Sequence, residues 1–163
     1  TTMTNKLSVE VADKSLLMVR EVDAPRELVF QAYASCEAIK QWFGPQPWPV
    51  THCEMDFRAG GQWHFKMTGP NGEEGWSLAR YEEIQAPERI VYVDSFSDAD
   101  RNIVPPESRV TVEFVDRGPK KTLLRMQSVY ASNDARDQVI AMGVEQGVGI
   151  SFDQLEAYLA TQQ

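Results

Sequence analysis

The feature that most constrains the fold is an alternation of apolar and polar residues with a period of two, repeated along the middle of the chain. The alternation runs over residues 51–57, and after a turn at Gly60 and Gly61 it continues over residues 62–67. Across both segments the side chains on the more apolar face are Thr51, Cys53, Met55, Phe57, Trp63, Phe65 and Met67. Similar extended segments are expected at about residues 7–11, 16–22, 75–85, 88–96, 109–115 and 122–130. Short alternating segments joined by tight turns predict an antiparallel sheet with one face covered.

Helical patterns occur in two other places. Pro25 suits the first position of a short helix, and Ser35 is suited to cap a second one, which Gly44 and Pro45 end. A long helix is expected at about residues 134–160. Its apolar face comprises Val144, Val148, Phe152, Leu155 and Leu159. Gly143, Gly147 and Gly149 each cost about 1 kcal/mol relative to Ala inside a helix, so its first half is expected to be irregular or closely approached.

The composition excludes several classes of partner. The 163 residues suit one domain, and 24 acidic against 16 basic residues give a net charge of −8. Nucleic acids and anionic membranes need a positive surface, so neither is expected as a partner. No apolar run approaches a membrane span and no leader is recognisable, which together predict a cytoplasmic protein. Cys36 and Cys53 have no metal-binding spacing and are expected to be buried free thiols.

Four strings give the sequence a family resemblance. They are DAPRELVF at residues 23–30, WFGP at 42–45, DFRAGGQW at 56–63 and PERI at 87–90. In this order and spacing the chain resembles the START-like superfamily, also called SRPBCC or helix-grip. Within it, the chain is similar to the family related to the C-terminal domain of the activator of the heat-shock-protein-90 ATPase. The resemblance covers about residues 16–159.

The resemblance implies a single α+β domain over residues 1–163, with residues 1–15 as an extension or an extra strand. In the helix-grip fold a curved antiparallel sheet wraps around a long C-terminal helix, two short helices close one end, and a cavity lies between helix and sheet. Many family members have Gly-Trp where this chain has Gly147 and Val148, a difference that enlarges or reshapes the cavity. The N-terminal domain of the full-length chaperone activators is absent, so ATPase stimulation does not transfer.

If the apolar face of the sheet points inward, it defines a candidate binding site for a small apolar or amphipathic molecule. The site residues expected from alternation and helical spacing are Trp42, Phe43, Met55, Trp63, Phe65, Met67, Phe114, Met126, Val144, Val148 and Phe152. A solidly packed core is the structural alternative. Three methionines, at positions 55, 67 and 126, suit ligands of several shapes.

No catalytic residue, metal site or cofactor is expected from the motifs. His52 and His64 lie on the polar faces of their strands and are expected at the surface, and Asp56 is expected to support a turn. Alternation is weaker around Arg80, Arg109, Arg125 and Gln127, for which two interpretations stay open. An outward, solvated side chain is favoured, and the alternative is that one of them faces inward and binds a ligand carboxylate. The face occupied by Trp76, Leu78 and Arg80 is not decided by the sequence.

Two alternative functions remain. One is a cyclase-like or other enzyme that uses the same cavity and needs an inward acidic, basic or phenolic side chain. The other is a protein-interaction module linked to chaperones or the stress response, with Trp42, Trp48 or Trp76 in an exposed apolar patch. A protein partner or a homodimer is possible under this second alternative.

Overall fold

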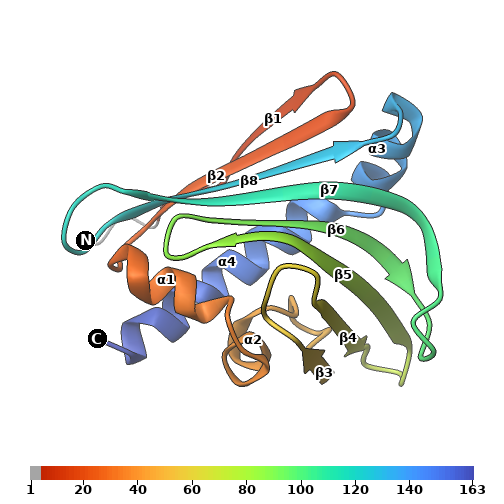
Figure 1. Cartoon of the computed structure of the whole chain (residues 1–163), viewed down its shortest axis with the longest axis horizontal. Coiled ribbons are helices and arrows are strands. Elements are labelled where there is room, and N and C mark those ends of the chain that lie inside the picture. Colours follow the sequence, from red (N-terminus) through yellow and green to blue (C-terminus); the bar gives the residue numbers. More distant parts are fainter. Residues whose placement is uncertain (1–4) are drawn as a thin grey trace.

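The computed structural model describes residues 5–163, and this part of the chain folds as one antiparallel sheet with helices against it (Figure 1). The eight strands are β1 (Ser8–Ala12), β2 (Ser15–Val22), β3 (Val50–Met55), β4 (Gln62–Thr68), β5 (Glu74–Gln85), β6 (Arg89–Ser97), β7 (Ile103–Asp116) and β8 (Thr122–Tyr130). The helices are α1 (Arg26–Ala32), α2 (Cys36–Trp42), α3 (Asn133–Ala141) and α4 (Val144–Thr161). The strand order is β1-β2-β8-β7-β6-β5-β4-β3.

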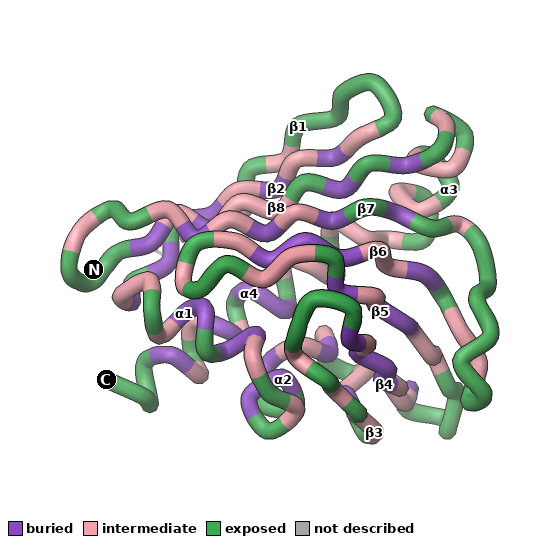
Figure 2. The backbone as a smooth tube through the Cα atoms, viewed as in Figure 1, coloured by how far each residue is buried: buried purple, intermediate pink, exposed green. Residues whose placement is uncertain are grey.

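The α+β helix-grip prediction is confirmed. The sheet curves around α4, and α1 and α2 lie at one end of that groove (Figure 1). On β2 and along most of β7, buried positions alternate with more exposed ones, so one face of this part of the sheet is covered (Figure 2). β4 and β6 instead contain runs of consecutive buried residues. Ser35 caps α2 as expected, since its side chain accepts a hydrogen bond from the Ala38 amide. None of the described helices is both long and apolar enough to span a membrane.

The predicted C-terminal helix is in fact two helices. The break falls at Gly143, whose φ of 89° lies in the left-handed region that favours glycine. Gly147 and Gly149 remain inside α4. The polar segment between the strands expected at about residues 88–96 and 109–115 is partly strand as well, because β7 already begins at Ile103.

Prolines are tolerated at the start of β7 because that part of the strand has one partner. Ile103 and Val104 pair with β6, and pairing with β8 begins only at Ser108. A proline has no N–H to donate, so it suits a segment with an unpaired edge. The sequence signal of two consecutive prolines therefore marks an edge here and not a loop.

The free-thiol prediction is wrong: Cys36 and Cys53 form a disulfide. It joins the first residue of α2 to β3, across 17 positions of sequence, with the two Cα atoms 5.7 Å apart. The proline-rich connection between α2 and β3 brings these elements together, and neither cysteine's local sequence pattern reveals that approach. The disulfide therefore anchors α2 to β3, at one edge of the sheet.

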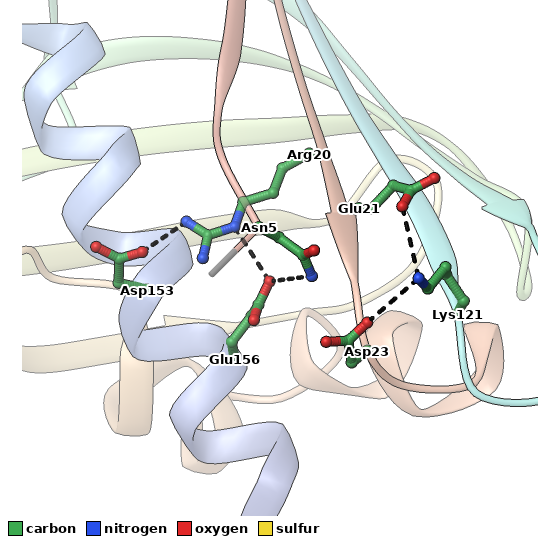
Figure 3. A network of polar contacts seen from close by, with 7 residues as sticks. All are labelled: Asn5, Arg20, Glu21, Asp23, Lys121, Asp153 and Glu156. Carbon is green, nitrogen blue, oxygen red and sulfur yellow. Dashed lines mark hydrogen bonds and ion pairs between the residues drawn. The ribbon is translucent and has the colours of Figure 1, made fainter. Parts of the chain in front are cut away.

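A buried arginine on β2 connects the sheet to α4 (Figure 3). Arg20 on β2 is 3% exposed and donates hydrogen bonds to Asp153 at 2.7 Å and Glu156 at 3.1 Å. Asn5 also donates to Glu156, at 3.1 Å. This network satisfies the guanidinium and fixes the C-terminal half of α4 against β2.

Candidate functional site

A cavity of about 250 Å³ lies between the covered face of the sheet and α4. Its walls come from the end of α2, from strands β4 to β8, and from α3 and the first half of α4. Phe96, near the end of β6, is the most exposed of the lining residues, at 36%, and Pro106 on the neighbouring β7 also lines the cavity. The cavity therefore reaches the surface near the β6–β7 connection. At about 250 Å³, the space is large enough for a small molecule.

Most of the residues expected in the site border this one cavity. Those that line it are Trp42, Phe43, Trp63, Phe65, Met67, Met126, Val144, Val148 and Phe152. Met55 and Phe114 do not. Phe114 packs edge-on against Phe30 and Tyr33 beneath α1, and Met55 packs against the core at the end of β3. The alternation places them on the covered face, but the cavity does not extend to their positions.

An aromatic cluster forms one part of the cavity wall. The Phe43 ring lies edge-on to Trp63 at 4.9 Å and to Phe65 at 5.4 Å between ring centroids. Trp63 and Phe65, both on β4, stack at 4.6 Å. The Trp42 indole N–H donates to the Ala32 carbonyl at 3.0 Å, which fixes its ring in the same cluster. These contacts produce a rigid apolar surface.

Hydrogen bonds hold the helix wall against the end of α2. The Ser151 hydroxyl donates to the Phe43 carbonyl at 2.6 Å. The Gln154 amide donates to the Trp42 carbonyl at 2.7 Å and to the Gly44 carbonyl at 2.8 Å. Val148 lies one turn earlier on the same face of α4 as Ser151, and both residues line the cavity. A small side chain at position 148 leaves volume that a larger one would fill.

A polar part of the wall, which the sequence did not predict, lies on the three central strands. Asp94 on β6 pairs in register with Ser108 on β7, and Ser108 pairs with Tyr130 on β8. Ser128 lies one row along, and all four residues line the cavity. Directly opposite side chains on neighbouring strands lie about 5 Å apart at Cβ. The carboxyl and the hydroxyls therefore form one polar surface, here called the Asp94 patch.

The Asp94 patch was missed because β6 gives no clear alternation. Val91 and Val93 are as apolar as the neighbours Ile90 and Tyr92, so the sequence does not indicate which face Asp94 occupies. Only the register with β5 and β7 assigns it to the covered face. The one sequence signal that could have identified Asp94 as a site residue was a carboxyl group inside an otherwise apolar strand.

Burial governs the ionisation of this patch. It raises the pKa of Asp94 to about 7, although a hydrogen bond involving the Ser95 backbone opposes the shift. Burial also raises the pKa of Tyr92 and of Tyr130, and the nearby Asp94 charge adds to both shifts. The two phenols therefore stay protonated at neutral pH and are available as hydrogen-bond donors.

Several polar residues considered from sequence lie away from the cavity. His64 is buried and not at the surface as expected: it stacks on Trp76 at 4.9 Å, and its Nε2 hydrogen-bonds to the Asp98 carbonyl at 2.9 Å. His52 remains exposed and pairs with Glu54. Residues 5–163 contain no cluster of three or more potential metal-ligating side chains.

The arginines and tryptophans considered from the sequence differ in whether they lie at the surface or in the core. Arg80 pairs with Glu107 and Arg109 with Glu82, and neither arginine lines the cavity. Trp42 is 1% exposed and cannot contribute to a surface patch, whereas Trp48 and Trp76 are half-buried.

A curved sheet that encloses a cavity against its C-terminal helix defines a helix-grip protein of the START-like class. The family described as "Activator of Hsp90 ATPase homolog 1-like protein" matches residues 23–160, and the chain belongs to this family. No curated protein matches the sequence.

Solved structures of several bacterial proteins have the same fold. Protein Ms6760 from Mycobacterium smegmatis is 28% identical, with a TM-score of 0.84 and 94% of each chain covered. A protein from Staphylococcus epidermidis is 30% identical, with a TM-score of 0.81 over 96% of this chain and 95% of the other. A protein from Arthrobacter aurescens is 26% identical, with a TM-score of 0.87 over 94% and 91%.

Proposed function

We propose that this protein binds a small amphipathic molecule in the cavity between the sheet and α4. The observation that carries the proposal is the cavity itself, about 250 Å³ with a rigid aromatic wall and a compact polar patch. An apolar cavity of about 150 Å³ is already sufficient to bind benzene. Apolar walls with a few convergent polar groups are typical of small-molecule sites.

A cavity-filling substitution tests the proposal. Val148→Trp places a large ring in the cavity lining. Ile150→Trp is the matched control, because Ile150 is on the same helix, is 41% exposed and does not line the cavity. The probe is the neutral fluorophore N-phenylnaphthylamine, titrated against each protein.

We expect the parent protein and Ile150→Trp to bind the probe with similar affinity. Val148→Trp is expected to bind at least about tenfold more weakly, because the indole occupies the space of the ligand. Equal binding by the two tryptophan variants, or no binding by the parent, would overturn the proposal.

An enzyme that uses the same cavity is the second candidate function. The observation in its favour is Asp94, whose pKa of about 7 is suited to general acid–base chemistry near neutrality. The two functions differ in what happens to the bound molecule. Mass spectrometry of a ligand recovered after incubation would find it unchanged for a binding protein and altered for an enzyme.

The cellular compartment of the protein can also be tested. A cytoplasmic location, favoured by the sequence, requires the Cys36–Cys53 bond to persist where thiols are normally reduced. Fractionation combined with thiol labelling of the native protein tests this, because labelled cysteines in the cytoplasmic fraction would contradict the bond there.

A chaperone-linked role has no supporting contact surface at Trp42, which is buried.

A further inference from the structure

Asp94 is the one charged side chain among the residues that line the cavity in the described part of the chain. No arginine, lysine or histidine shares this lining. The arginines on the neighbouring strands, Arg80 and Arg109, sit in register with Val93 and pair with glutamates away from the cavity. The cavity therefore combines a carboxyl group with apolar walls and offers no cation to a ligand.

The groups that face Asp94 are neutral donors or apolar surfaces. Tyr92 lies on the same strand and Tyr130 on β8, and burial raises the pKa of both phenols. Ser108 is directly across on β7. The part of α3 and α4 that lines the cavity contributes no ionisable side chain. Nothing on these elements neutralises a charge on Asp94.

This arrangement discriminates between ligand charges. An anionic head group would meet like charge and no counterion, which is unfavourable in a poorly solvated site. A protonated amine would supply the counterion that the carboxylate lacks and would form a charge-assisted hydrogen bond with it. The aromatic rings of Tyr92 and Trp63 border the same space and also favour a cation.

We propose that the cavity takes a small amphipathic amine, with its protonated nitrogen against the Asp94 carboxylate and its apolar body against the aromatic cluster of Phe43, Trp63 and Phe65. The row in which Asp94 lies leads to this cluster: Trp63 on β4 and Asp94 on β6 are separated by Ala79 on β5. Ala79 itself is fully buried, and Ser77 is the β5 residue that lines the cavity between its two ends. One ligand can therefore extend from the carboxyl to the aromatic wall.

This inference rests on the proposed function. Three probes of matched shape distinguish a failure of the amine assignment from a failure of the proposed function. Naphthylethylamine is cationic, naphthylethanol is neutral and naphthylacetate is anionic. Isothermal titration calorimetry at about pH 8 measures each with the parent protein and with Asp94→Asn, which keeps the side-chain shape and removes the charge. Circular dichroism establishes that the variant is folded.

We expect the parent protein to bind the amine at least about tenfold more tightly than the alcohol, and the carboxylate most weakly. Asp94→Asn is expected to lose that preference while its affinity for the alcohol is retained. With the parent protein alone, the amine's affinity is expected to be lower at about pH 5.5 than at about pH 8, because Asp94 is largely neutral at the lower pH while the amine stays charged.

Each other result has a defined meaning. Binding of the alcohol with no preference for the amine overturns the amine assignment and leaves the proposed function standing. Failure of all three probes and of N-phenylnaphthylamine overturns both. A preference for the amine that survives in a folded Asp94→Asn variant assigns it to another group and overturns the role of Asp94.

Discussion

Arg20 is a charged residue at a position where alternation predicts the core. On β2 it lies on the same face as Met18 and Val22, and it is buried because Asp153 and Glu156 satisfy its guanidinium. We expect Arg20→Ala to lower the free energy of unfolding by about 2 kcal/mol, since it removes hydrogen bonds between charged groups. Urea denaturation measures the change.

Lys121 provides the control on the same side of the molecule (Figure 3). Its ammonium lies 3.7 Å from Glu21 and 3.8 Å from Asp23, and all three side chains are exposed. Lys121→Ala is therefore expected to change the free energy of unfolding by less than about 0.5 kcal/mol. Equal losses in the two variants would contradict the role given to the buried network.

Residue-level prediction from the sequence succeeded where a strand alternates clearly. Trp63, Phe65 and Met67 were assigned to the covered face from their spacing, and all three line the cavity. Asp94 could not be assigned because both faces of β6 are largely apolar. His64 was misplaced because a segment far along the chain, near Asp98, covers the opposite face of the sheet, and local alternation contains no information about that contact.

At the scale of elements, the break between α3 and α4 is the clearest departure from the sequence prediction. Gly143 adopts φ of 89°, whereas Gly149 is helical and a Cβ there would meet Leu7 only at 4.0 Å. We expect Gly143→Ala to lower the free energy of unfolding by about 1–2 kcal/mol, because an L side chain disfavours the left-handed region. Gly149→Ala is expected to raise it by up to about 1 kcal/mol.

Thermal and urea denaturation of both variants measure these opposite effects. A Gly143→Ala variant as stable as the parent would mean that the helix break does not depend on the left-handed residue. The sequence indicated that glycines disturb the helix, but three glycines within seven residues offered three places for a break. Only the packing of α3 against β2 and β8 selects the first of them.

At the scale of the whole molecule, the disulfide connects the helical end to the edge of the sheet. The double substitution Cys36→Ser and Cys53→Ser is expected to lower the free energy of unfolding by about 3 kcal/mol, from the loop-closure entropy of a 17-residue separation. A reducing agent should destabilise the parent protein similarly and leave the double variant unchanged. Two reactive thiols in the native parent protein would contradict the bond.

The pH dependence of stability is the second whole-molecule property that the structure predicts. Folding raises the pKa of Asp94 to about 7, against an ordinary value near 4. Between these values the folded chain binds the additional proton, so the free energy of unfolding falls as pH rises. The contribution of Asp94 is fully present below about pH 4 and is lost as pH rises through about 7.

Surface carboxylates act in the opposite direction. Hydrogen bonds with His52, Arg89 and Asn102 lower the pKa values of Glu54, Glu83 and Asp98, respectively. Their contribution is present above about pH 4 and is lost as pH falls through the lowered pKa values.

Together the two effects predict maximal stability on the acid side of neutrality, at about pH 5, with a decline towards about pH 8. Asp94→Asn removes the group that titrates in that interval, so its stability is expected to stay level from about pH 5 to about pH 8. Urea denaturation of both proteins across this range makes the comparison, and acid unfolding below pH 4 should remain in both. A parallel decline in the variant would assign the titration to another group. A flat profile in the parent protein would mean that the Asp94 carboxyl ionises without cost, which would require a well-solvated cavity.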